Sequence, residues 1–232
     1  MDWQALFLTL KLDLVVCVLL LLVGVPLAFW LAFSQWRWKF LIEAIVALPL
    51  VLPPTVLGFY VLMAMGPHGP LGKLWQMFFG HGLAFTFEGL VLASVLYSLP
   101  FAVQPLIASF ESVDRTLLDA SSVLGAGRLR TFWRVILPLS IPGVVIAVVL
   151  SFAHTMGEFG VVLMVGGNLA GVTRTVSIDI YDHVQSLEYA EANRMALVLL
   201  AISFVVLSVV YGVNRQLGRP IGRRLWTPWA AK

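Results

Sequence analysis

The chain has 232 residues, of which 60% are hydrophobic and only 12% are charged. A water-soluble domain of this composition could not cover its surface with polar groups, so the sequence predicts an integral membrane protein. The single cysteine, Cys17, excludes a disulfide framework and a cysteine metal site, and the net charge of +3 is not arranged as the basic, aromatic-interleaved stripe that nucleic-acid binding requires.

Five apolar stretches are each long enough to cross the hydrocarbon core as a helix, which takes about 20 residues. No internal repeat or low-complexity segment divides them, so we predict one all-α transmembrane domain over residues 1–232. The first stretch lacks a basic flank and is longer than the hydrophobic region of a secretory signal, so we interpret it as a retained span. The predicted spans are residues 14–33, 44–65, 89–110, 139–165 and 195–213.

The second predicted span contains a proline pair, Pro53 and Pro54. Proline removes a backbone donor and bends a helix, which a membrane tolerates only where protein or water satisfies the freed carbonyls. We therefore expect the pair to face protein or a cavity. Residues 66–87, which are rich in glycine and proline, predict a loop with a short helix at the membrane interface.

A polar stretch, residues 111–138, separates the third and fourth spans and carries Arg128, Arg130 and Arg134. Apolar residues recur at helical spacing up to Leu124, and Gly125 then permits a sharp turn because glycine adopts positive φ without penalty. A second short helix is expected from about residue 129, with Phe132 and Trp133 exposed beside the arginines. This pattern predicts a rigid knob for a partner protein. The alternative is an interfacial hairpin whose cations meet anionic lipid.

The basic residues predict the orientation, because short cytoplasmic loops collect Lys and Arg. With five spans, residues 34–43, residues 111–138 and the tail after Asn214 lie on one side of the membrane. The N-terminus is therefore expected outside, and the C-terminus and the 111–138 stretch inside. These segments hold eleven of the fifteen cations: Arg37, Lys39, Arg115, Arg128, Arg130, Arg134, Arg215, Arg219, Arg223, Arg224 and Lys232. In the tail, Trp226 and Trp229 predict an interfacial anchor.

The fourth predicted span places His154 and Glu158 one helical turn apart in apolar surroundings. Ionisable groups at membrane depth are costly and mark a pathway or a paired structural site. One His and one Glu fall short of the three protein ligands that a zinc site usually has. Either Glu158 bonds His154 or a neighbouring helix, or it lines a cavity where Gly157 and Gly160 allow close helix approach. We favour the second interpretation, in which Glu158 holds a gate.

The 111–138 stretch contains a spaced motif. Asp119-Ala120-Ser121 is followed at the expected offset by Gly125 and then by Val135-Ile136-Leu137-Pro138. This motif resembles the Glu-Ala-Ala, Gly, Ile-x-Leu-Pro signature of ABC importer permeases, with Asp for Glu, Ser for the second Ala and Val for Ile. The resemblance implies short coupling helices that dock on an ATPase. The residues implied in that docking are Asp119, Ala120, Ser121, Gly125, Arg128, Arg130, Leu137 and Pro138.

Two further stretches resemble a particular group of ABC importer permeases. Gly157-Glu158-Phe159-Gly160 is similar to the permeases of molybdate, tungstate and sulfate ABC importers, and the run from Leu48 to Leu62 is similar to the molybdate members in particular. The resemblance covers about residues 14–213 and implies the type I ABC importer permease fold. The translocation path or gate is then expected to include Pro53, Pro54, His154, Gly157, Glu158, Phe159 and Gly160.

The same resemblance implies an assembly in a bacterial inner membrane. Two copies of the chain would enclose the path, an oxyanion-binding protein would deliver the cargo outside, and separate ATPase subunits would hold ATP and Mg inside. The chain itself is then expected to catalyse no reaction and to bind no metal or cofactor. Molybdate is the expected cargo, with tungstate or sulfate as alternatives, and membrane lipid is the remaining partner.

Two other classes of function remain open on the residues alone. An ion-coupled secondary transporter would use Glu158 and His154 as a proton relay, and an intramembrane hydrolase would be built on Ser98 or His154. Neither class needs the 111–138 stretch, which favours the importer. The loop at residues 168–194 is either a solvated linker or a contact for a binding protein, and its Arg174 could attract an oxyanion.

Overall fold

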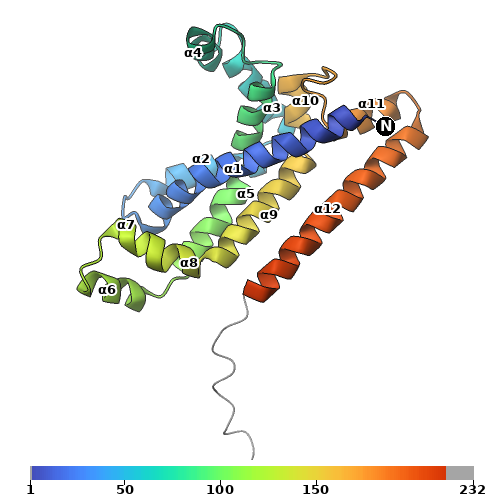
Figure 1. The fold of residues 1–232 in the computed structure, drawn as a ribbon. Helices are drawn as coiled ribbons and strands as arrows, with labels where there is room; N and C mark the ends of the chain where they lie inside the picture. The colour runs from blue at the N-terminus through green and yellow to red at the C-terminus, as the bar shows by residue number, and fades with distance from the viewer. Residues whose placement is uncertain (1, 218–232) are drawn as a thin grey trace, which may run out of the picture.

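The computed structural model describes residues 2–217, with side chains described as far as Gly212, and this part of the chain is helical without strands (Figure 1). The prediction of an all-α membrane protein is confirmed. The helices are α1 (Trp3–Phe33), α2 (Lys39–Val51), α3 (Pro54–Met65), α4 (Pro70–Phe79), α5 (Phe87–Glu111), α6 (Arg115–Val123), α7 (Arg128–Thr131), a π-helical turn η1 (Phe132–Ile136), α8 (Leu137–Leu139), α9 (Ile141–Met156), α10 (Gly160–Gly166), α11 (Val176–Gln185) and α12 (Tyr189–Leu217).

Three helices in the described residues are long and apolar enough to cross a membrane by themselves: α1, α5 and α12. Two further spans are bent. The α2–α3 pair bends by 116°, and the helical stretch Arg128–Leu139 meets α9 at 72°. The described residues therefore supply up to five spans if each bent pair counts as one. Of the predicted tail features, Arg219, Arg223, Arg224, Trp226, Trp229 and Lys232 lie outside the described residues.

The first helix is longer than the predicted 14–33 span. Helix α1 begins at Trp3 because the Asp2 carboxylate accepts hydrogen bonds from the backbone N–H groups of Gln4 (2.8 Å) and Ala5 (3.0 Å). This cap extends the helix over residues that the sequence placed outside the membrane span, among them Asp13. Helix α12 likewise begins before residue 195, at Tyr189.

Two predicted spans are not continuous helices. The 44–65 span ends at Val51 and restarts at Pro54, because Leu52 and Pro53 adopt extended backbone and proline suits the first position of the new helix. The 139–165 span is interrupted at residues 157–159, which we call the break: α9 ends at Met156 and α10 begins at Gly160. The proline pair predicted a bend in the first case, but the break was not predicted.

Helix α5 is the centre of the bundle and packs against α1 on one side and α9 on the other (Figure 1). At one end its Phe110 and Val103 share a buried cluster with Ala28 of α1 and Phe132 of η1. Toward the other end its Leu90 packs with Leu12, Val16 and Leu20 of α1, Val162 of α10 and Ile178 of α11. Helices α6 and α7 lie at the end of the molecule opposite α4, α10 and α11 (Figure 1).

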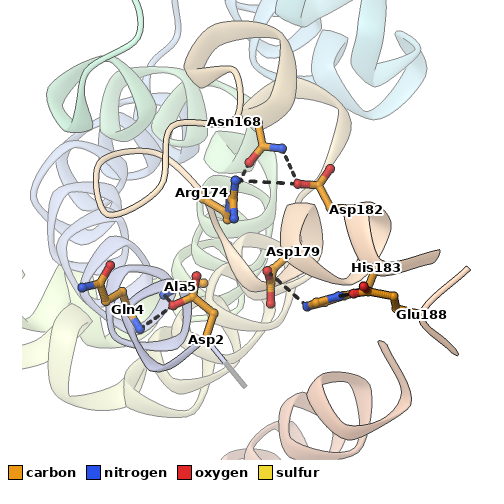
Figure 2. A network of polar contacts seen from close by, with 9 residues as sticks. All are labelled: Asp2, Gln4, Ala5, Asn168, Arg174, Asp179, Asp182, His183 and Glu188. Atoms are coloured by element: carbon orange, nitrogen blue, oxygen red, sulfur yellow. Dashed lines mark hydrogen bonds and ion pairs between the residues drawn. The ribbon is translucent and has the colours of Figure 1, made fainter. Parts of the chain in front are cut away.

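The loop at residues 168–194 is structured, so its interpretation as a solvated linker is wrong for its central part. Helix α11 is tied to α1 because the backbone N–H of Val176 donates to Thr9 Oγ1 at 2.9 Å. Arg174 donates to Asn168 Oδ1 at 2.6 Å, and His183 lies between Asp179 and Glu188 (Figure 2). This end of the bundle is therefore held together by polar contacts between the loop, α11 and α1. Helix α4 forms within residues 66–87, as predicted.

Candidate functional site: the coupling segment and the break

Residues 111–138, which we call the coupling segment, begin with a well-capped helix. The Asp114 carboxylate accepts a hydrogen bond from the backbone N–H of Thr116 at 2.9 Å, which starts α6. The same hydrogen bond lowers the pKa of the Asp114 carboxyl, because it favours the ionised form. The local sequence therefore fixes where the first helix of the segment begins.

Gly125 ends α6 in a Schellman motif. Its φ is +74°, its N–H donates to the Ser122 carbonyl at 2.9 Å, and the N–H of Ala126 donates to the Ser121 carbonyl at 3.1 Å. Only glycine adopts this backbone conformation without strain. The predicted stop at Gly125 is confirmed, and the turn directs the chain back into α7.

The second half of the coupling segment is anchored in the bundle. Phe132 is buried, and its ring lies 5.0 Å from Phe29 of α1 and 6.0 Å from Phe110 of α5, centroid to centroid. The hydroxyls of Ser121 and Thr131 share a hydrogen bond of 2.8 Å that joins α6 to α7. The prediction that Phe132 is exposed is wrong, because the π-helical turn directs its ring inward. Trp133 is exposed, as predicted.

The tip of the coupling segment exposes large apolar side chains among arginines. Val123 and Leu124 are 86% and 85% exposed, and Leu129 is 73% exposed. Sequence reasoning assigned Val123 and Leu124 to a helix face and missed this exposure, which follows from the end of α6 projecting beyond the bundle. Among the predicted docking residues, Asp119, Ala120, Gly125, Arg128, Arg130 and Pro138 are exposed, and Ser121 and Leu137 are half-buried.

The break brings together most of the predicted path residues. A Cβ atom on Gly160 would lie 2.8 Å from the Pro54 Cβ, so the proline pair and the break adjoin and require glycine at this contact. Phe159 packs against Tyr181 of α11, with ring centroids 5.0 Å apart. Pro53, Pro54 and Gly157 are exposed in the single chain.

His154 and Glu158 do not bond each other within the described residues. The His154 ring stacks on Phe101 at 3.9 Å and lies 4.6 Å from Tyr97, and its Nε2 atom has no hydrogen-bond partner in the described part of the chain. Because α9 ends at Met156, the two residues no longer share one helical turn. The alternative in which they bond each other is therefore wrong.

Glu158 is 3% exposed and lies in the break. Its backbone carbonyl accepts a hydrogen bond from Ser177 Oγ of α11 at 2.6 Å, and the Ser94 hydroxyl of α5 lies beside its carboxylate. Asp13 of α1 is 0% exposed, and its carboxylate oxygens have no hydrogen-bond partner within residues 2–217. Sequence reasoning missed Asp13, because the predicted span began one residue after it.

Comparison with known proteins identifies the family to which this chain belongs. The family model for the binding-protein-dependent transport system inner membrane component matches residues 24–221. The chain belongs to this family. It is 55% identical over 215 residues to the molybdenum transport system permease protein ModB of Azotobacter vinelandii, which covers 92% of this chain and 95% of that protein. It is 35% identical over 209 residues to ModB of Escherichia coli K12, covering 90% and 91% of the two chains.

Solved ABC importers share the fold at low identity. A bacterial transporter that imports the acidic polysaccharide alginate aligns with a TM-score of 0.73 at 18% identity, over 93% of this chain and 79% of that chain. The MetNI methionine transporter aligns with a TM-score of 0.69 at 16% identity, over 93% and 95%. These likenesses establish the type I ABC importer permease fold, as predicted.

Proposed function

We propose that this chain is the permease subunit of an ATP-driven importer for molybdate, with tungstate or sulfate as the alternative cargo. The cargo assignment is supported by the molybdenum transport permeases, which match most of the chain. The family consists of membrane components of binding-protein-dependent systems, so ATP hydrolysis belongs to a separate subunit. The chain forms the path and binds no nucleotide, metal or cofactor.

The observation that carries this proposal is the coupling segment. It presents an exposed apolar tip with Arg128 and Arg130, while Phe132 fixes it to α1 and α5. A groove of about 670 Å³ lies between the end of α1 and this segment, lined in part by Phe33, Ser122 and Arg128. An apolar centre with cations at its rim is the composition of a protein docking surface.

The coupling segment can transmit movement of a docked ATPase to the bundle because it is anchored in the bundle. Because the coupling segment and the bundle share one buried cluster, closure of two ATPase subunits would move the segment and the bundle together. The break, where the backbone departs from helix, lies next to the proline pair. We infer that the movement opens or closes the path at this contact. Weak contacts from small polar groups and backbone suit a path that must release its cargo.

The assembly follows from the same proposal. Two copies of the chain would enclose the path about a two-fold axis. The end of α1, the start of α2 with Lys39 and the coupling segment with its arginines share one side of the molecule, which supports a cytoplasmic location for that side in the bacterial inner membrane. The N-terminus and α11 lie at the other end, where a periplasmic or extracellular oxyanion-binding protein would dock.

Uptake by the reconstituted complex tests the proposal. The permease, its ATPase and the oxyanion-binding protein are placed in proteoliposomes, and accumulated molybdenum, tungsten and sulfur are measured by mass spectrometry. We expect ATP-dependent molybdate uptake that requires the binding protein. Uptake that persists without ATP and collapses with the proton gradient would instead support the ion-coupled transporter, and turnover of a peptide or lipid by the isolated chain would support the hydrolase.

A further inference from the structure

An apolar groove of about 750 Å³ lies between α1 and the second half of the coupling segment, and the proposed transport mechanism does not use it. One wall is a stripe along a single face of α1, because its residues recur at helical spacing. The residues of this stripe are Val18, Leu21, Leu22, Val25, Pro26 and Phe29. The opposite wall includes Leu129, Phe132 and Leu137, and we call this hollow the α1 groove.

The α1 groove occupies one half of the membrane span. Lys11 and Trp30 are exposed toward opposite ends of α1, and side chains of these types favour the two membrane boundaries. About 28 Å of helix separates them, close to the hydrocarbon thickness of about 30 Å. Val18 is the central residue of α1, so the stripe from Val18 to Phe29 runs about 16 Å from mid-membrane to the boundary at Trp30. This is the depth of one leaflet.

Both walls of the α1 groove face outward in the single chain. Leu22 is 66% exposed on one wall and Leu129 is 73% exposed on the other. A water-soluble ATPase subunit cannot reach the part of this groove that lies at hydrocarbon depth. The tail of a lipid is already present at that depth, and its length matches the leaflet that the stripe crosses.

Arg128 lies where the α1 groove meets a more polar hollow. It also lines the groove of about 670 Å³ at the end of α1, to which Ser34 and Ser122 belong. None of the ion pairs among the described residues involves Arg128, and no acidic side chain of that part of the chain lines either groove. A guanidinium beside hydroxyl groups binds a phosphate through charge-assisted hydrogen bonds.

We propose that the α1 groove holds one acyl chain of an anionic phospholipid whose phosphate pairs with Arg128. The bound lipid contacts both α1 and the coupling segment, in addition to the protein contacts that Phe132 makes. The exposed tip remains available to the ATPase, because Val123 and Leu124 line neither groove. Assignment of the lipid to the cytoplasmic leaflet rests on the proposed function, whereas the binding itself does not.

Native mass spectrometry of the permease–ATPase complex tests the site by counting the lipids that stay bound. The complex is titrated with dioleoyl phosphatidylglycerol or with dioleoyl phosphatidylcholine, which has the same acyl chains and no net charge. We expect the wild type to retain phosphatidylglycerol more strongly. Leu22→Trp fills the groove and is expected to lower that binding about tenfold. Leu14→Trp is the matched control, because Leu14 is also on α1, is 67% exposed and does not line the groove.

A second pair of variants tests the head group. Arg128→Gln removes the cation and is expected to lower phosphatidylglycerol binding roughly fivefold, to the level of phosphatidylcholine. Arg130→Gln removes an exposed arginine from the same short helix, but Arg130 lines neither groove. This variant is expected to bind phosphatidylglycerol as the wild type does.

Three results would overturn the proposal. Equal retention of the two lipids by the wild type, or equal loss in Leu14→Trp and Leu22→Trp, would show general lipid contact without a site. Separation of the permease chains in Leu22→Trp would show that the α1 groove is a contact between two copies. Loss of only the ATPase from Arg128→Gln, with phosphatidylglycerol retained, would assign the guanidinium to docking. Because the measurement needs no cargo, failure of molybdate uptake would contradict the proposed function and leave the lipid result intact.

Discussion

At the scale of single residues, the shape of the coupling segment depends on Gly125. Its φ of +74° is the conformation that costs other residues about 1 kcal/mol or more, while nothing lies within 4 Å of a Cβ built on it. We therefore predict that Gly125→Ala weakens copurification of the permease with its ATPase, and that Gly125→Asp abolishes it, with membrane insertion intact in both.

Gly127 provides the matched control for this prediction. It is equally open, but its φ of −69° suits any residue. Gly127→Ala is therefore expected to copurify as the wild type does. Equal copurification for Gly125→Ala, Gly125→Asp and Gly127→Ala would show that the turn is not required for docking.

Asp179 of α11 gives the stability of the fold a dependence on pH. Burial raises the pKa of its carboxyl, and the nearby His183 opposes that shift. Because the folded pKa lies above the unfolded value of about 3.9, the ionised form is disfavoured by folding, and stability is lost as pH rises from there through the folded pKa. We predict that Asp179→Asn removes this loss from the melting temperature measured against pH. Asp182→Asn, which removes a smaller contribution to the same pKa from a half-buried neighbour, should retain most of it.

At the scale of elements, the anchoring of the coupling segment can be separated from its docking. Phe132 is 8% exposed and Trp133 is 60% exposed, although they are adjacent in η1. Removing a buried Phe side chain costs about 3–5 kcal/mol. We predict that Phe132→Ala lowers the melting temperature of the permease alone, whereas Trp133→Ala leaves it unchanged and weakens only ATPase binding. If Trp133→Ala lowered the melting temperature and Phe132→Ala did not, Trp133 rather than Phe132 would be the residue that anchors the segment.

The contact between α3 and α10 is the second element-scale feature. A Cβ on Gly160 would meet the Pro54 Cβ at 2.8 Å, whereas a Cβ on Gly157 would have no neighbour closer than 3.7 Å. Overpacking costs about 1–3 kcal/mol. We predict that Gly160→Ala lowers molybdate uptake by roughly tenfold, which corresponds to about 1.4 kcal/mol, and that Gly157→Ala retains it. Uptake of the two variants in proteoliposomes decides whether this contact belongs to the gate.

At the scale of the whole molecule, residues with strong local conformational preferences were predictable. Gly125 stops a helix and the Pro53–Pro54 pair bends a span wherever they occur, and the apolar stretches locate the membrane helices. The break at residues 157–159 was not predictable, because Gly157 and Gly160 lie in an apolar run and the backbone of the break is supported by a distant residue, Ser177. Periodicity likewise gives no sign that Phe132 faces inward.

The burial of Asp13 likewise could not be predicted from the sequence. Asp13 lies in α1, which begins at the Asp2 cap and is bonded at Thr9 by α11, a helix that returns from far along the chain. Neither contact leaves a local pattern in the sequence. The burial of Asp13 is therefore a product of tertiary structure, whereas the coupling segment is largely encoded in one continuous stretch.

The central claim is that the exposed tip of the coupling segment meets an ATPase on the inner side of the membrane. A photo-crosslinking residue at Leu124 tests it most directly in the assembled importer, with Met77 of α4 as the control, because Met77 is also exposed, at 81%, but lies at the opposite end of the molecule. We predict that position 124 cross-links to the ATPase subunit and that position 77 does not. Absence of a cross-link from position 124 in an active complex, or its labelling by a membrane-impermeant reagent from outside, would contradict the account.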